Sequence, residues 1–227
     1  MVCQDAGVGQ DVSPAIIILD FDGVIVESNG AKDEAFETLF SDFPEYLAPL
    51  RAYHLSLNAV DRFSKFRHMT GHILGLPPDE AERVCRDWSV RFQELTRKTV
   101  LHCPWVPGAQ EFLEFFYGTR PLYLASATPQ AELDWLVENR GLSKYFRGVY
   151  GAPIRKAEVL LSILTTQGIP AVQALFIGDS PEDWEAARNA KVPFIGRKSR
   201  THFPGAEFPV FSDLVEILNY LRGEAAS

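Results

Sequence analysis

The sequence predicts an α/β fold: a Rossmann-like parallel sheet with helices on both faces, interrupted after its first strand by an all-helical insertion. From about residue 107 onward, short apolar runs that suit buried strands alternate with segments of helical period. Residues 31–100, in contrast, show helical periodicity and no evident strand. With 227 residues, 46% of them hydrophobic, the chain is long enough for one sizeable core and an insertion.

The first expected strand runs from Ile16 to Asp20 and is apolar up to its last residue. A second carboxylate, Asp22, follows two positions later. A carboxylate at the end of a buried strand is costly unless a metal ion or hydrogen bonds compensate for it. The pair therefore indicates either a catalytic arrangement or an ordinary Asp-Gly turn that ends a strand. Residues 1–14 lack the basic start and apolar segment of a signal peptide, and we expect a flexible tail there.

Residues 31–100 are expected to form a separate helical domain, whereas residues 15–30 and 101–227 form the core domain. The clearest apolar stripe of the insertion follows Pro77 and Pro78, with Asp79 as the expected N-cap. Its members recur at helical spacing: Ala81, Val84, Cys85, Trp88, Phe92 and Leu95.

The remainder of the chain alternates strands and helices. The expected strands cover about residues 122–126, 174–179 and 193–196, with a short extended piece near 148–150. The expected helices cover about residues 107–117, 128–141, 155–167 and 212–222, and a further helix begins at Ser180. Thr128 and Ser180 are the expected N-caps of their helices, each followed by a proline at the first helical position.

Polar side chains end three of the expected strands: Asp20, Ser126 and Asp179. The carboxyl ends of parallel strands meet at one edge of the sheet, where ligands bind. Asp183 lies in the first turn of the helix after Asp179, and its side chain leans back toward that edge. Together with Asp22, these carboxylates would repel one another unless a hard divalent cation were present. All-oxygen ligands favour Mg²⁺, although Asp179 and Asp183 alone could merely cap a helix.

A bound cation would in turn attract an anionic substrate, and a phosphate group suits the remaining residues. Ser126 and Ala127 offer a hydroxyl and a strand-end amide, and Lys156 opens a helix whose N-terminus adds a partial positive charge. Arg155 or Lys144 could be the true phosphate partner instead of Lys156. In such a site a free carboxylate can attack phosphorus and form an acyl phosphate, which water then hydrolyses. A second acid can protonate the leaving oxygen and later activate the water.

The four sequence motifs resemble, in their order, those of the haloacid dehalogenase superfamily of hydrolases. They are Asp20-Phe21-Asp22-Gly23-Val24, Ser126, Lys156 and Gly178-Asp179-Ser180-Pro181-Glu182-Asp183. The helical insertion resembles the cap of the phosphoglycolate phosphatase and β-phosphoglucomutase-like branch. One departure is Glu27 before Ser28, where this branch usually has Asp-Ser. We expect little consequence, because that position closes a turn.

The resemblance implies a role for each aspartate. Asp20 would be the nucleophile and a magnesium ligand, and Asp22 would be the acid/base, with its backbone carbonyl on the metal. Asp179 would bind magnesium directly, and Asp183 would bind it or orient its ligands. The presence of Asp22 argues against a dehalogenase and against the phosphonate-cleaving relatives.

The resemblance also assigns Ser126, Ala127 and Lys156 to the transferring phosphoryl group. The helical insertion, as the cap, would then bind the leaving group of the substrate and determine which substrate is accepted. Within the cap, Arg62, Lys65 and Arg67 place three cations within two turns, and we expect Arg62 and Lys65 to face the substrate. The alternative is a solvated helix face.

We therefore expect a Mg²⁺-dependent phosphatase that hydrolyses a small phosphomonoester, either a sugar phosphate or a phosphoglycolate-like compound, through an aspartyl-phosphate. One alternative is a β-phosphoglucomutase-like phosphomutase. Another is a catalytically silent binding protein, whose signature would be the loss of an essential aspartate, and none is lost here.

Composition restricts the partners. A net charge of −8 and a pI of about 5.2 disfavour nucleic acid and anionic membranes as main partners. No apolar run approaches the length of a membrane span. His68 and His72 are four residues apart but lack an evident third ligand, which argues against zinc. The three cysteines fit neither a zinc site nor a disulfide framework, so we expect a cytoplasmic protein with reduced thiols. We expect the protein to be a monomer or a homodimer.

Overall fold

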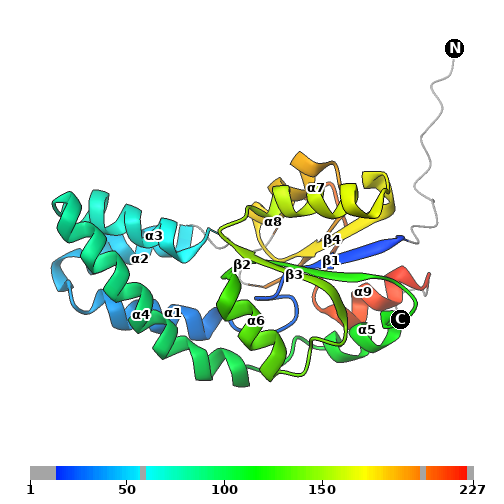
Figure 1. Cartoon of the computed structure of the whole chain (residues 1–227), viewed down its shortest axis with the longest axis horizontal. Coiled ribbons are helices and arrows are strands. Elements are labelled where there is room, and N and C mark those ends of the chain that lie inside the picture. The colour runs from blue at the N-terminus through cyan, green and yellow to red at the C-terminus, as the bar shows by residue number, and fades with distance from the viewer. Residues whose placement is uncertain (1–13, 57–59, 200–202, 224–227) are drawn as a thin grey trace, which may run out of the picture.

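A six-stranded parallel sheet forms the centre of the computed structural model, which describes residues 14–56, 60–199 and 203–223. The strand order is β3-β2-β1-β4-β5-β6, with β1 in the interior of the sheet (Figure 1). The strands are β1 (Ile16–Leu19), β2 (Leu122–Pro129), β3 (Phe146–Ala152), β4 (Ala174–Gly178), β5 (Phe194–Arg197) and β6 (Val210–Phe211). Of the expected tail, residues 1–13 lie outside the described residues, and Pro14 is buried.

Both faces of β1 are buried, which explains its unbroken run of large apolar residues. Ile17 and Leu19 belong to the apolar cluster on one face, and Ile16 and Ile18 to the cluster on the other. The first face is covered by α5 (Ala109–Phe116), α6 (Gln130–Asn139) and α9 (Leu214–Leu221). The second face is covered by α7 (Lys156–Gln167) and α8 (Pro181–Ala190). The structure thus confirms the predicted α/β fold class.

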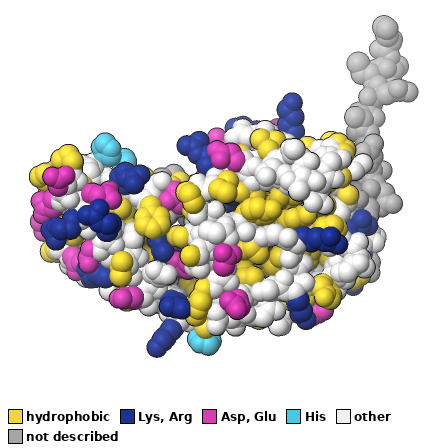
Figure 2. All heavy atoms as spheres, viewed as in Figure 1, with side chains coloured by type: hydrophobic (Ala, Val, Ile, Leu, Met, Phe, Trp, Pro, Cys, Tyr) yellow, Lys and Arg dark blue, Asp and Glu magenta, His cyan; other side chains and the backbone are white. Residues whose placement is uncertain are grey.

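Four helices between β1 and α5 pack around an apolar cluster of their own, and we call them the helical group (Figure 1). They are α1 (Asn29–Phe40), α2 (Leu47–Ser56), α3 (Arg62–His68) and α4 (Pro78–His102), with a 3₁₀ turn at Pro44–Tyr46 and a π-helical turn at Met69–Ile73. Figure 2 shows acidic and basic side chains interspersed over this group. The domain boundaries expected at residues 30/31 and 100/101 remain a prediction.

The chain leaves the sheet for the helical group and returns from it along two segments that pair with each other. Val26 and Trp105 form an antiparallel bridge. The backbone N–H of Glu27 donates to the carbonyl of Pro104 at 2.9 Å. The two connections therefore run side by side as a short ribbon.

Arg140, the residue after α6, fastens the end of α4 to the core. Its Nη1 donates to the carbonyls of Val100 and Leu101 at 2.9 and 2.7 Å. Its Nη2 donates to the carbonyl of Cys103 at 2.9 Å. The last carbonyls of a helix have no partner within the helix, so one guanidinium satisfies acceptors that would otherwise need water.

Several expected boundaries differ from the structure. β2 continues to Pro129, so α6 begins at Gln130 and Thr128 is not its N-cap. Likewise, Pro77 is the N-cap of α4, and Asp79 lies in its first turn. The two-residue strand β6 was not expected at all, because so short an edge strand leaves almost no periodic signal. No helix in the described part of the chain is both long and apolar enough to cross a membrane.

Candidate active site

Three carboxylates gather at the carboxyl edge of the sheet. Asp20 follows β1, Asp179 follows β4, and Asp183 lies in the first turn of α8. One oxygen of each lies within 4.8 Å of the others, and the residues are 4%, 6% and 0% exposed. Among the described residues, this is the single cluster of three or more His, Cys, Asp or Glu side chains that could hold a metal ion.

The position of Asp183 is fixed by the start of α8, as the sequence predicts. Ser180 is the N-cap, and its hydroxyl accepts from the Asp183 N–H at 3.2 Å. In return, Oδ2 of Asp183 accepts from the backbone of Ser180 at 3.2 Å and from its hydroxyl at 2.7 Å. A Cβ on Gly178 would lie 2.4 Å from the Cβ of Asp183, so only glycine leaves room for this approach.

Asp179 is held by residues from the loop that follows β1 and the helix after it. Asn29 donates to its Oδ2 at 3.0 Å. Gly23 has φ +72°, and a Cβ there would lie 2.0 Å from the same oxygen. This loop therefore needs glycine for both its left-handed backbone and its contact with Asp179.

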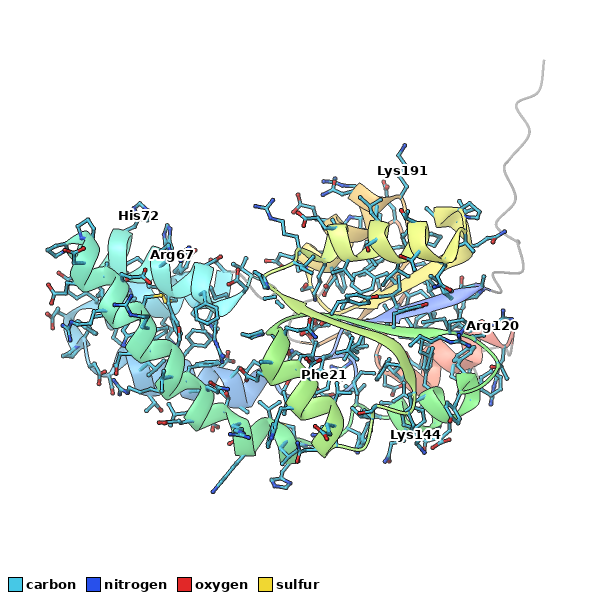
Figure 3. All side chains as sticks on the ribbon, viewed as in Figure 1. Phe21, Arg67, His72, Arg120, Lys144 and Lys191 are labelled. Atoms are coloured by element: carbon cyan, nitrogen blue, oxygen red, sulfur yellow. The ribbon has the colours of Figure 1, made fainter. Side chains whose placement is uncertain are left out.

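Lys156 lies among the carboxylates. Its Nζ is 2.9 Å from Oδ2 of Asp20 and 2.6 Å from Oδ1 of Asp183. Of the two alternatives, Arg155 is exposed. Lys144 pairs with Glu114 at 3.2 Å, at the far end of the core from the helical group (Figure 3). Lys156 is thus the lysine that the fold brings to Asp20.

Ser126 and Ala127, the other expected phosphate ligands, lie near the end of β2. Both line a groove that also includes Lys156, and Ala127 additionally lines the pocket above Asp20. Ser126 is 2% exposed, and its hydroxyl accepts from the backbone N–H of Thr128 at 3.1 Å. The fold therefore brings the expected phosphate-binding residues to the same edge of the sheet as the three aspartates.

The electrostatics of the cluster call for additional positive charge. Burial raises the pKa of Asp20 well above its ordinary value, against the opposing effect of Lys156. Burial and the neighbouring Asp183 raise the pKa of Asp179 to about 6. Burial opposes the charge of Lys156, but Asp183 and Asp20 outweigh burial and raise the pKa of its ammonium. A single lysine thus faces three buried carboxylates whose oxygens suit a hard divalent cation, so the residues fit a metal ion.

Asp22 lies in a different environment from Asp20. Lys32 of α1 places its Nζ 2.5 Å from Oδ2 of Asp22, Thr128 donates to the same oxygen at 3.0 Å, and Ser28 donates to Oδ1. Burial opposes ionisation of Asp22, but Lys32 and these hydrogen bonds outweigh it and lower the pKa. Sequence reasoning identified neither Lys32 nor Thr128 as part of the site.

A pocket extends from these aspartates to the helical group. Arg62 and Lys65 both line it and are only 8% and 4% exposed, whereas Arg67 is exposed. Figure 3 places Arg67 and His72 on the helical group, well away from the core. Two of the three cations of α3 thus face the pocket and one faces solvent.

The pocket also contains charged residues that the sequence analysis did not single out. Glu132, in the first turn of α6, lies with its Oε2 2.6 Å from Nη2 of Arg62. His54 and Asp33, which also line the pocket, approach to 2.7 Å. Their partners are distant in the sequence, so no local pattern marks them.

The histidine pair and Glu27, which the sequence analysis singled out, contact other residues as follows. The rings of His68 and His72 lie 4.8 Å apart, and His68 stacks on Tyr53 at 4.2 Å. Arg197, at the end of β5, donates to the carbonyl of Gly23 at 3.1 Å and pairs with Glu27. Glu27, the residue that departs from the Asp-Ser pattern, thus helps to hold the loop after β1 against β5.

Comparison with known proteins agrees with this arrangement. Residues 17–197 match the family model of haloacid dehalogenase-like hydrolases. A phosphoglycolate phosphatase from Pseudomonas savastanoi pv. phaseolicola is 25% identical over 187 residues, which are 79% of this chain and 67% of that protein.

Solved structures share the fold. A haloacid dehalogenase-superfamily hydrolase of subfamily IA from Geobacter sulfurreducens PCA superposes with a TM-score of 0.63 at 23% identity, covering 92% of this chain and 98% of that one. A predicted phosphoglycolate phosphatase from Haemophilus somnus 129pt gives a TM-score of 0.72 at 18% identity, covering 91% and 97%.

Proposed function

Since the chain belongs to the haloacid dehalogenase-like hydrolases, we propose that it hydrolyses a small phosphomonoester through an aspartyl-phosphate on Asp20, with Mg²⁺ as its cofactor. It is a hydrolase that acts on phosphoric monoesters, as its motifs predicted. The observation that carries the mechanism is the position of Asp20. One oxygen of this residue lies within 4.8 Å of Asp179 and Asp183, and Lys156 contacts it at 2.9 Å, while Asp22 is held separately by Lys32.

In the first step, an oxygen of Asp20 attacks phosphorus and the ester P–O bond breaks. Asp22 gives its proton to the leaving alkoxide. Asp22 must be protonated for this step, and a phosphoryl group beside it favours that form, since a nearby negative charge disfavours the carboxylate. Lys156, Ser126 and Ala127 hold the oxygens of the transferring group.

In the second step, a water molecule attacks the phosphorus of the acyl phosphate. Asp22, now ionised, takes a proton from that water, and the bond between phosphorus and the Asp20 oxygen breaks. Inorganic phosphate leaves and Asp20 is free again. Lys32 stabilises the ionised form of Asp22 that this step requires.

Asp20 and Asp179 would hold the cation, and Asp183 would bind it or orient its ligands. Bound there, Mg²⁺ would offset the negative charge of the phosphoryl group and of the carboxylates. All three residues supply oxygen, which is the ligand that Mg²⁺ prefers.

The relatives named phosphoglycolate phosphatase support a small phosphorylated metabolite as the substrate. The buried thiols of Cys85 and Cys103, which form no disulfide, agree with the proposed cytoplasmic location. Whether the protein is a monomer or a homodimer remains a prediction.

The test is phosphate release from a panel of phosphomonoesters with and without Mg²⁺, by the wild type and by Asp20→Asn. We expect the variant to lose roughly 10³-fold or more of the activity and to keep the fold, since Asn has the same size as Asp. Asp87→Asn, at an exposed site on α4, is the matched control. Isomerised phosphate without release would favour a phosphomutase instead. No reaction with any ester would favour a silent binding protein, and full activity of Asp20→Asn would exclude Asp20 as the nucleophile.

A further inference from the structure

An ion pair between the helical group and the core forms part of the pocket wall. Nη2 of Arg62, on α3, lies 2.6 Å from Oε2 of Glu132, on α6. Both residues are buried, at 8% and 4% exposed, and both line the pocket that contains Asp20 and Asp22. A leaving group that extends from Asp20 past Asp22 toward the helical group would occupy this pocket.

The pair retains unused hydrogen-bonding capacity. Within the described part of the chain, Nε of Arg62 has no hydrogen-bond partner, and Oε2 of Glu132 contacts Arg62 without a well-directed hydrogen bond. A buried polar atom without a hydrogen bond costs about 1–3 kcal/mol. The rings of Phe63 and Phe92 lie 5.6 and 5.4 Å from the guanidinium of Arg62. A group with both a donor and an acceptor, such as a hydroxyl, would satisfy Glu132 and Arg62 together.

The charge of the pocket distinguishes a hydroxyl from a carboxylate. Its cations are Lys32, Arg62, Lys65 and Lys156, and its carboxylates are Asp20, Asp22, Asp33, Glu132 and Asp179. Lys32 is paired with Asp22 and Arg62 with Glu132, at 2.5 and 2.6 Å. A carboxylate on the leaving group would have to approach Glu132 at low dielectric, where like charges repel strongly.

We propose that Arg62 and Glu132 select a phosphate ester of an uncharged, hydroxyl-bearing alcohol, of the glycerol or sugar type, and reject phosphoglycolate. This inference rests on the proposed phosphatase function. It assigns Glu132 as a hydrogen-bond acceptor for a substrate hydroxyl and Arg62 as a donor to the same group. Specificity of this kind is strong because the wrong substrate leaves buried polar groups unpaired.

The experiment measures kcat/KM for glycerol phosphate and for phosphoglycolate with Mg²⁺, and takes the ratio of the two. For the wild type we expect a ratio of roughly 10 or more in favour of glycerol phosphate. Glu132→Gln keeps the size of the side chain but removes its charge. In this variant the value for phosphoglycolate rises and the ratio falls by about 10-fold or more. Glu138→Gln, at an exposed position of the same helix, is the matched control and leaves the ratio unchanged.

Each outcome has a distinct meaning. If the wild type prefers phosphoglycolate, the inference is wrong but the proposed phosphatase function is not affected. This measurement uses the wild type only, so it does not depend on whether Glu132→Gln folds. If Glu132→Gln changes kcat/KM equally for both esters, the inference is also wrong, because the Arg62–Glu132 pair then has only a structural role. A third substrate, acetyl phosphate, is an acyl phosphate with a small carboxylate leaving group and needs no selective leaving-group pocket. Phosphate release from other esters of the panel, but from neither glycerol phosphate nor a sugar phosphate, overturns the inference alone, whereas no release from any ester overturns the proposed function itself.

Discussion

Lys32 holds Asp22 from outside the sheet: its Nζ lies 2.5 Å from Oδ2 of that carboxylate and 3.0 Å from the hydroxyl of Thr128. Lys32 belongs to α1, the first helix of the helical group, whereas Asp22 follows β1 and Thr128 lies in β2. The group proposed to move the proton is thus positioned by residues from two segments other than its own.

Replacing Lys32 with Met should slow alkyl phosphate hydrolysis by roughly 10²-fold, because a misplaced Asp22 cannot protonate the leaving oxygen. Aryl phosphates need little protonation of their leaving group and should lose far less. The measurement is kcat/KM for one alkyl and one aryl ester, which reports the steps up to formation of the aspartyl-phosphate and leaves out its hydrolysis. Lys98→Met, at an exposed site on α4, serves as the control. Equal losses for both esters would contradict the role given to Lys32.

Magnesium should stabilise the folded protein, because it relieves the repulsion within the cluster of Asp20, Asp179 and Asp183. At a free metal concentration 100 times the Kd, the gain is about 2.7 kcal/mol, or roughly 5–10 °C in Tm. Thermal melts with Mg²⁺ and with EDTA measure this shift. Asp179→Asn should lose most of it, and Asp87→Asn should retain it. An equal shift in both variants would place the metal elsewhere.

Comparing Gly23→Ala with Gly75→Ala should separate the displacement of the Asp179 side chain by a new Cβ from the backbone strain of a positive φ. Gly75 has a similar positive φ, +64° against +72°, but a Cβ at Gly75 would meet nothing within 4 Å, whereas one at Gly23 would lie 2.0 Å from Oδ2 of Asp179. We expect Gly75→Ala to cost about 1 kcal/mol of the free energy of unfolding from strain alone. Gly23→Ala should cost more and also abolish the Mg²⁺-dependent shift in Tm. A Gly23→Ala variant that binds Mg²⁺ normally would exclude the proposed contact.

Arg140→Met should destabilise the protein by about 2–3 kcal/mol, because the carbonyls of Leu101 and Cys103 lose the guanidinium donor and the carbonyl of Val100 keeps only the backbone N–H of Cys103, at 3.4 Å. Denaturant unfolding measures the difference. Arg86→Met is the comparison: Arg86 is exposed and pairs with Glu82 at 3.3 Å, a contact worth at most about 0.5 kcal/mol. Similar losses in the two variants would show that the carbonyl contacts add little.

Local patterns predicted the elements whose signals lie within a few residues of one another. The run from Ile16 to Leu19 indicated a strand buried on both faces, and Ser180 followed by Pro181 indicated the start of α8. Strand order then explains why Asp20 and Asp179 meet, since β1 and β4 are neighbours and parallel. These features follow from periodicity, helix-capping chemistry and the geometry of parallel sheets.

The other part of the pocket could not be predicted in this way. Thr128 contacts Lys32 and Asp22 across 96 and 106 positions of sequence, and Arg62 meets Glu132 only after the helical group has packed against α6. A threonine before a proline is a typical helix start, so its local signal indicated a cap although β2 continues past it. Packing between segments that are distant in the sequence determines which of these residues contact one another, and a single sequence carries no local pattern for such contacts.

The paired connections at Val26 and Trp105 have a consequence for how this protein can be altered. The two connections that flank the helical group are neighbours in an antiparallel bridge, so they are separated by roughly the 5 Å of adjacent strands. A peptide of any length that begins and ends at this spacing could replace the group without changing the register of the sheet. We therefore expect the position to accept grafted sequences that keep Asn29 and Lys32 of α1, and a library built there would vary substrate choice while both contacts to Asp22 and Asp179 are retained.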